Sequence, residues 1–296
     1  MSRVNLVGLL PSELEDLAVE LGASRYRGRQ LATWIYRKSV FDLEAMTDLP
    51  KDFRAVLAER AVVEVPEPER LTPSQDGSQK LVFALAGGSR ISSVLMPDDD
   101  RITLCVSTQA GCGFACAFCL TGVMGLERNL TAAEIVGQVL AANRLLDPDG
   151  RRATHIVFMG MGEPLANFAA LVKSLRILTD AKLGVGYSPR RLTVSTVGLV
   201  PGIEKLGRED LKVNLAISLH ATTDDVRSRL MPVNRSFDLA ALMAAVGRYP
   251  LASRQRVFFE YVMLEDVNDT TDDARRLARL LRGLKAKVNL IPFNDW

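Results

Sequence analysis

The sequence has few cysteines, few histidines and no long apolar run. Among its 296 residues are four cysteines and two histidines. Three of the cysteines are clustered, which suits a reducing compartment better than a disulfide-stabilised scaffold. The longest apolar runs, such as residues 257–264, are interrupted by Glu260 and are far too short to span a bilayer. Residues 1–5 lack the apolar stretch of a signal peptide, so we expect a cytoplasmic protein that does not contact a membrane.

A strong excess of one charge is also missing. Lysine and arginine number 37 against 35 aspartates and glutamates, so the net charge neither requires nor excludes a nucleic-acid partner. Residues 21–41, however, contain five cations and no acid, with Tyr26, Trp34 and Tyr36 between them. Such a stretch could follow a phosphate backbone and stack on bases. A solvated helix face with Trp34 packed inward is an equally good interpretation.

The first hundred residues predict a helical region followed by a small β extension. Apolar periodicity and turn residues indicate helices beginning near Pro11, over residues 28–38 and over residues 50–60. Residues 62–73 are rich in proline and glutamate and are predicted to be a linker. Two short strands, 80–85 and 90–96, are joined by Gly87 and Gly88 and predict a hairpin.

From residue 103 onward, strand and helix patterns alternate, which predicts a parallel sheet with crossover helices. Helical patterns cover residues 132–145, 168–179 and 271–281. Six units are too few for a closed eight-stranded barrel, so we expect an α/β fold with a partial (β/α)6 barrel. The predicted domains are 1–65 (helical accessory), 66–100 (linker and hairpin) and 101–296 (barrel). The candidate strands are 103–107, 154–159, 191–195, 212–218, 256–262 and 287–291.

The clustered cysteines are Cys112, Cys116 and Cys119, in a C-x3-C-x2-C spacing directly after the first predicted barrel strand. Three thiolates on so short a loop can hold three corners of a cubane [4Fe–4S] cluster. The fourth iron is then open to a small chelating molecule. A structural zinc site is the alternative, but it needs four closed ligands, and only Cys105 or a distant histidine could be the fourth.

Polar and glycine residues stand where the other predicted strands end, which is where barrels of this type carry their chemistry. After the second strand, Gly162 allows close approach of a ligand, and Glu163 can accept hydrogen bonds from an ammonium group. His155 lies at the start of its strand and is predicted to be structural. Further strand-end residues are Ser195, Thr196, Ser218, Leu219, His220 and Asn294.

Together these residues resemble the radical S-adenosylmethionine (SAM) 23S rRNA (adenine-C2) methyltransferases of the RlmN family and their C8-methylating relative Cfr. The resemblance covers nearly the whole chain in order. It rests on residues 104–112, 158–165, 218–221, 229–234 and 288–294, and on residues 27–31 and 34–36 for an accessory helical domain.

The resemblance implies a [4Fe–4S] cluster on Cys112, Cys116 and Cys119, with SAM chelating the open iron. One electron would cleave SAM to a 5′-deoxyadenosyl radical, which takes hydrogen from a methylated cysteine so that the carbon can add to adenine C2. Cys105 matches the resolving cysteine that releases the product through a transient disulfide. The SAM contacts implied by motif are Gly162, Glu163, Ser195, Ser218, Leu219, His220 and Asn294.

The implied partners are 23S rRNA, tRNA as a second RNA substrate, and an electron donor such as flavodoxin or ferredoxin. The resemblance also implies a monomer. Because sequence-specific RNA recognition mostly targets unpaired bases, the basic residues 25–38 are the predicted RNA platform.

Two positions depart from the family pattern. The family's methyl-accepting cysteine lies some tens of residues beyond the asparagine that matches Asn294, but no cysteine follows Cys119 in this sequence. Ser92 stands where the family usually has a proton-accepting glutamate, and a serine hydroxyl cannot fill that role unaided. We therefore expect either a fragment of a longer protein, which the abrupt end favours, or a homologue that binds SAM and RNA without methylating. C8 rather than C2 chemistry is a further alternative.

Overall fold

The protein is described by a computed structural model that covers residues 3–294. Its contacts divide the chain into two compact units. The first contains residues up to 107 together with 129–156 and 169–188, and the second contains 108–128, 157–168 and the chain from 189 onward. Within the described residues, no helix is long and apolar enough to cross a membrane.

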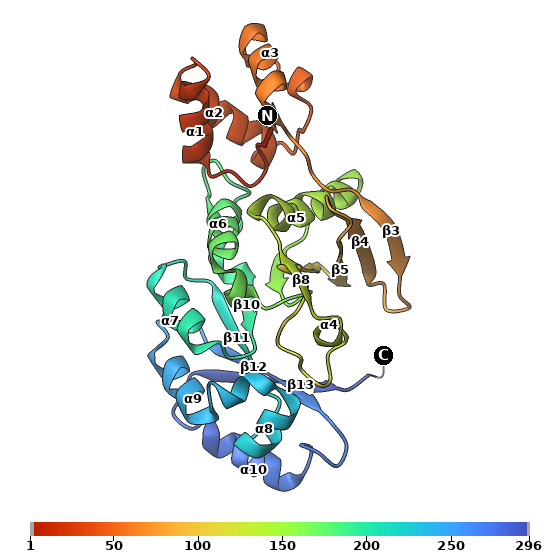
Figure 1. Ribbon diagram of the computed structural model, residues 1–296, viewed down its shortest axis with the longest axis vertical. Coiled ribbons are helices and arrows are strands. Elements are labelled where there is room, and N and C mark those ends of the chain that lie inside the picture. The colour runs from red at the N-terminus through yellow and green to blue at the C-terminus, as the bar shows by residue number, and fades with distance from the viewer. Residues whose placement is uncertain (1–2, 295–296) are drawn as a thin grey trace. The chain divides into compact units, whose positions relative to one another are not determined.

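The helical part of the first unit follows the sequence prediction closely (Figure 1). Its helices are α1 (Pro11–Glu20), α2 (Arg25–Ala32) and α3 (Lys51–Arg60), with a π-helical turn at Thr33–Arg37 and a 3-10 turn at Leu43–Ala45. A short parallel pair, β1 (Val4–Asn5) and β2 (Ala61–Val62), joins its two ends. Also in this unit are α5 (Ala132–Leu146), begun by a capping box of Thr131 and Glu134, and most of α6 (Phe168–Thr179).

Four antiparallel strands complete the first unit: β3 (Pro68–Pro73), β4 (Gln79–Ala84), β5 (Arg90–Asp98) and β6 (Arg101–Cys105). The predicted hairpin is confirmed by β4 and β5. The prediction of a linker over residues 62–73 was wrong, because β3 pairs with β4 there. β3 pairs on one side only, and an edge strand tolerates the prolines at its two ends, since one row of its backbone groups needs no ladder partner.

The second unit holds the parallel strands β10 (Leu192–Thr196), β11 (Asn214–Ser218), β12 (Val257–Met263) and β13 (Ala286–Pro292). All six predicted barrel strands are therefore present, since β6 and β9 (His155–Phe158) are the first two. β9 has two residues in each unit. The helices between the parallel strands are α7 (Val200–Arg208), α8 (Asp224–Leu230), α9 (Leu239–Arg248) and α10 (Thr271–Leu280) (Figure 1). A short pair, β7 (Gln109–Gly111) and β8 (Leu126–Asn129), flanks α4 (Leu120–Val123).

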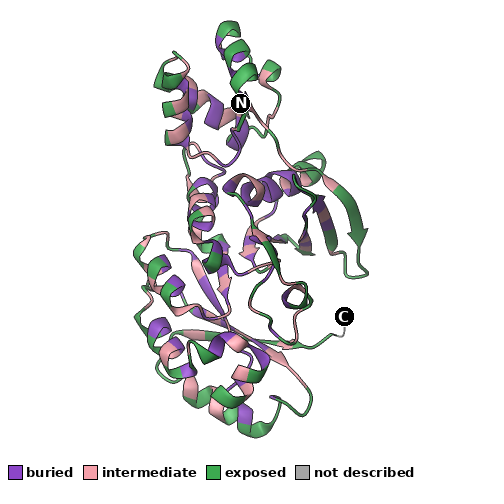
Figure 2. Cartoon of the chain, in the orientation of Figure 1, coloured by how far each residue is buried: buried purple, intermediate pink, exposed green. Residues whose placement is uncertain are grey.

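Alternation along the parallel strands separates a core face from a polar face. In β12, Val257, Phe259 and Tyr261 are buried, whereas Glu260 between them is only half-buried. Register then aligns like residues: the buried Val194 lies opposite the buried Leu215, and Ser218 lies opposite Glu260. Because neighbouring residues in register share a face, the half-buried Ser218 and Glu260 lie on one side of the sheet. Figure 2 shows buried and intermediate residues along the parallel strands.

Candidate functional site

A pocket of about 270 Å³ lies in the second unit, on the face of the sheet that carries Ser218 and Glu260. Every residue that lines it belongs to this unit. The lining comes from the cysteine loop, from the turn after β9 and from the ends of β10 to β13. The volume is close to the lower end of the range for small-molecule sites, roughly 300–1,000 Å³.

The cysteine loop is shaped by close backbone contacts. Gly111 has φ = +75°, and a Cβ there would lie 1.9 Å from the carbonyl oxygen of Gly125. That same carbonyl accepts a hydrogen bond of 2.8 Å from the amide of Cys112. Further along, the amide of Ala117 donates to the carbonyl oxygen of Leu230 at 2.9 Å. The loop is thus fixed at one end by its own strand pair and at the other by α8.

All three cysteines line the pocket, Cys112 and Cys116 as buried residues and Cys119 as a half-buried one. Burial raises the pKa of Cys116 to about 12, and the neighbouring thiols Cys119 and Cys112 raise it further. Burial also raises the pKa of Cys112. Thiols that disfavour one another's charge need a cation to hold them as thiolates.

The donor set fits an iron–sulfur cluster. Within residues 3–294, no group of three or more His, Cys, Asp and Glu side chains is arranged to hold a metal ion. The three cysteines line one largely apolar pocket, and in a cubane each cysteine would bind a different iron. Cys112, Cys116 and Cys119 would hold such a cluster, with the pocket beside it open to a chelating molecule.

Glu163 is a buried carboxylate that ties two strand ends together. Its side chain is 2% exposed. Oε1 accepts a hydrogen bond of 3.0 Å from the amide of Leu165, and Oε2 accepts one of 2.8 Å from the amide of Val197. Burial raises its pKa to about 7 despite these bonds. Glu163 lines the pocket, but both oxygens already have backbone donors.

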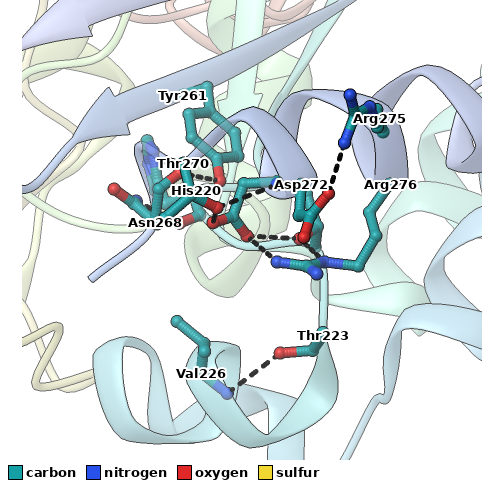
Figure 3. A network of polar contacts seen from close by, with 11 residues as sticks. His220, Thr223, Val226, Tyr261, Asn268, Thr270, Asp272, Arg275 and Arg276 are labelled. Atoms are coloured by element: carbon teal, nitrogen blue, oxygen red, sulfur yellow. Dashed lines mark hydrogen bonds and ion pairs between the residues drawn. The ribbon is translucent and has the colours of Figure 1, made fainter. Parts of the chain in front are cut away.

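His220 is a neutral, oriented imidazole. It is 4% exposed, and burial lowers its pKa to about 3. The amide of Val262 donates to Nδ1 at 2.9 Å, so the proton of the neutral ring is on Nε2. The ring stands edge-on to Phe118 of the cysteine loop, with centroids 4.7 Å apart. Asn268 holds the backbone, since its side-chain amide donates to the carbonyl oxygen of His220 at 2.7 Å (Figure 3). The same amide donates to the carbonyl oxygen of Val262, also at 2.7 Å.

Arg227 is a fully buried cation beneath the same strand ends. Its guanidinium donates to the carbonyl oxygens of Val197, Ser218 and Leu219 and to Oδ1 of Asn234. Burial lowers its pKa to about 10, which leaves it charged at neutral pH. These carbonyl groups belong to the ends of β10 and β11, so Arg227 holds the two strand ends in place.

The structure brings most of the predicted site residues together and leaves three elsewhere. Leu219 is buried but does not line the pocket, and the amide that it contributes donates to the carbonyl oxygen of Glu260. Asn294 is exposed and is not a lining residue. Cys105 ends β6 in the first unit and is half-buried. The predicted residues that do line the pocket are Cys112, Cys116, Cys119, Gly162, Glu163, Ser195, Thr196, Ser218 and His220.

Sequence reasoning missed two charged residues of the site. Arg227 lies two residues before a motif that carried the family resemblance, and Glu260 was noted only as an interruption of an apolar run. That interruption was a usable signal, because a single carboxylate inside a strand otherwise made of apolar residues must face something other than the core. Glu260 lines the pocket on the same face as Ser218.

Comparison with known proteins agrees with this geometry. Residues 4–63 match the ribosomal RNA large subunit methyltransferase N-terminal domain, and residues 106–281 match the radical SAM superfamily. A crystal structure of a radical SAM methyltransferase from Sphaerobacter thermophilus superposes with a TM-score of 0.93 at 48% identity, covering 99% of this chain and 86% of that one. The fold and the pocket thus define a radical SAM enzyme with a partial barrel, and the chain belongs to that superfamily.

Relatives with assigned names identify the family within this superfamily. The dual-specificity RNA methyltransferase RlmN of Geobacter sulfurreducens is 49% identical over 292 residues, which cover 99% of this chain and 79% of that protein. The protein of the same name from Syntrophotalea carbinolica is 50% identical over 295 residues, covering 99% and 78%. The chain belongs to the RlmN family. Membership implies a [4Fe–4S] cluster and SAM as its cofactors.

Proposed function

We propose that this protein is an RNA methyltransferase that uses radical SAM chemistry to methylate C2 of an adenine. The observation that carries the proposal is the convergence of Cys112, Cys116 and Cys119 with Ser218 and His220 on one pocket. The named relatives are RNA methyltransferases, which supports RNA as the substrate. C2 is preferred over C8 because the RlmN relatives cover almost the whole chain.

Within the pocket, the cysteines would hold the cluster, and SAM would lie against Gly162, Ser195, Ser218 and His220. When bound, such a cluster supplies the single electron that cleaves SAM reductively. The protein's own part is to bind and orient. His220 offers Nε2–H as a donor from a ring fixed by Val262, and the apolar walls exclude water from the reaction. Contacts from Glu163, Leu219 and Asn294 to SAM stay predictions, as does the role of Cys105 as a resolving cysteine.

We further propose that residues 1–65 form an RNA-binding accessory domain, residues 66–100 an extension, and residues 101–296 the barrel. Tyr26 is 57% exposed and lies under the guanidinium of Arg27, and Lys38 lies over the ring of Trp34 at 3.4 Å. An exposed aromatic side chain beside a cation, such as Tyr26, suits stacking on unpaired bases, whereas Trp34 is half-buried. Tyr36 is excluded from this surface, because it is 2% exposed and its hydroxyl donates to the carbonyl oxygen of Leu9.

The finer assignments are proposals that follow from the family. The RNA substrates are 23S rRNA and tRNA, which would place the protein in the cytoplasm with the ribosome. The electron comes from a small reductant protein such as flavodoxin or ferredoxin. The protein acts as a monomer.

The test is a reaction of the cluster-loaded protein with SAM, a reductant and 23S rRNA under anaerobic conditions. We expect reductive cleavage of SAM to 5′-deoxyadenosine and an adenine that carries a methyl group at C2, both identified by mass spectrometry of the digested RNA. A methyl group at C8 would correct the position. RNA binding without SAM cleavage or methylated product would contradict the proposal and favour a binding protein.

A further inference from the structure

One row of polar side chains crosses the pocket face of the sheet at β11, β12 and β13. Ser218 of β11 lies directly opposite Glu260 of β12, and Glu260 lies directly opposite Asn289 of β13. Residues opposite one another in adjacent strands share a face. Ser218 and Glu260 both line the pocket, so the row presents polar atoms inside the barrel.

The two carboxylate oxygens of Glu260 differ in their hydrogen bonding: one is held by a neighbouring side chain, and the other is open. Asn289 Nδ2 donates to Oε2 at 2.7 Å, and within residues 3–294 Oε1 has no hydrogen-bond donor. Burial raises the pKa of this carboxyl, and the Asn289 bond lowers it. Because Glu260 is only half-buried, this second oxygen is accessible from the pocket and can accept a hydrogen bond from a bound molecule.

The other carboxylate in the pocket cannot readily fill this role. Both oxygens of Glu163 already accept backbone hydrogen bonds, from Leu165 and Val197, and its side chain is 2% exposed. Glu163 therefore braces the loops around the pocket with both oxygens, while Glu260 offers a bound molecule an oxygen that accepts no hydrogen bond from residues 3–294.

The position of Glu260 selects the part of SAM that it would meet. The cysteine loop packs on residues that follow the strands, such as Leu230 and Met231, and Phe118 of that loop contacts His220 beyond the end of β11. Glu260 instead lies within β12, two residues before Val262. If the methionine end of SAM lies at the cysteines, as the proposed function has it, the nucleoside end extends toward the strands.

We propose that Glu260 accepts a hydrogen bond from the ribose hydroxyls of SAM, and that Asn289 is a positioning residue that fixes its carboxylate. This inference rests on the proposed function, because it requires that SAM occupy this pocket. A vicinal diol supplies two donors close together, which suits the uncommitted oxygen of a carboxylate that is held from one side.

The test measures equilibrium binding of S-adenosylhomocysteine, which has the same ribose and undergoes no cleavage, to the cluster-loaded protein by calorimetry. Loss of a hydrogen bond to a charged group predicts that Glu260→Ala raises Kd roughly 10- to 100-fold. Glu260→Gln keeps a neutral acceptor and is expected to lose less. Asn289→Ala, which frees the carboxylate to rotate, is expected to fall between the wild type and Glu260→Ala. The matched control is Glu265→Gln, an exposed carboxylate after the same strand, which should bind as the wild type does.

An analogue that lacks the 2′ and 3′ hydroxyls identifies the contacted group. The wild type should bind it more weakly than the parent ligand, whereas Glu260→Ala should bind the two with nearly equal affinity. An undiminished preference for the hydroxyls in Glu260→Ala would overturn the inference, and so would wild-type affinity in that variant. Iron content and thermal midpoint, measured for each variant, separate these results from misfolding. Failure of the wild type to bind either ligand would instead reject the proposed function, and this inference with it.

Discussion

The guanidinium of Arg227 donates a hydrogen bond of 2.7 Å to the carbonyl oxygen of Val197, the first residue beyond β10. The same group reaches Ser218 and Leu219 at the end of β11. Two strand ends that border the pocket are therefore held by one buried charge. Since Val197 also donates its amide to Glu163, two buried ionisable side chains act on the same short segment.

Replacing this cation should disrupt the site through its unpaired carbonyls. Arg227→Met leaves the oxygens of Val197, Ser218 and Leu219 without their donor, and we expect a loss of roughly 3–5 kcal/mol in the free energy of unfolding. Denaturant unfolding measures this. The control is Arg229→Met, which removes an exposed arginine paired with Asp225 and should change stability by less than about 1 kcal/mol. Equal losses in the two variants would contradict this account.

Two glycines of the cysteine loop allow steric contact to be separated from backbone strain. Gly111 and Gly125 have nearly the same φ, +75° and +74°, but a Cβ on Gly125 meets nothing within 4 Å. We expect Gly125→Ala to cost on the order of 1–2 kcal/mol of left-handed strain and to keep its iron. Gly111→Ala should carry the same strain and also displace the carbonyl that holds Cys112, so it should fail to bind the cluster. Iron per protein is the measurement, and retention of iron by Gly111→Ala would show that the contact is dispensable.

The cluster ligands can be tested against the remaining cysteine. Cys116→Ala should abolish cluster assembly and, with it, reductive cleavage of SAM, because three thiolates are needed to hold the cubane. Cys105→Ala should retain full iron content, since Cys105 lies on β6 outside the cysteine loop. Iron and sulfide analysis with visible absorption distinguishes the variants. Loss of iron from Cys105→Ala would reassign the ligand set.

His220 should stay neutral across the physiological range. Burial puts its pKa at about 3, below the value of about 6.5 for an exposed histidine. The unfolded chain therefore binds a proton between these values that the folded chain does not. The contribution of His220 to stability is complete above pH 6.5 and falls as the pH drops toward 3, by at most about 1.4 kcal/mol per pH unit.

Nitrogen NMR of the two histidines checks this directly. We expect one imidazole that remains neutral with its proton on Nε2 from pH 5.5 to 8.5. His155→Gln assigns that signal, because His155 is the only other histidine. A His220 signal that titrates near pH 6.5 would contradict the assignment.

In the N-terminal region, contacts with a neighbouring helix change how the basic stretch is interpreted. Residues 21–41 hold five cations and no acid, yet Arg25 pairs with Asp16 at 2.8 Å and Arg29 with Glu15 at 3.0 Å, both acids lying on α1. The acids are close in space because α1 packs on α2. Tyr36, counted among the aromatic residues of the stretch, is a core residue. Composition of a window cannot reveal either fact, because both depend on the neighbouring helix.

The cluster motif and the order of the elements were determined by the sequence itself. Cys112, Cys116 and Cys119 lie within eight residues, so any fold of that loop keeps the three thiols near one another, and alternation of strand and helix patterns fixed the barrel strands. Only the tertiary structure decided which polar residues share the pocket. A period of two assigns each strand residue to a face, but the register between strands places Glu260 beside Ser218 and Asn289. The tertiary structure also decided that Arg227 and Glu163 are buried, because the segments that surround these two ionisable residues lie far apart in the chain.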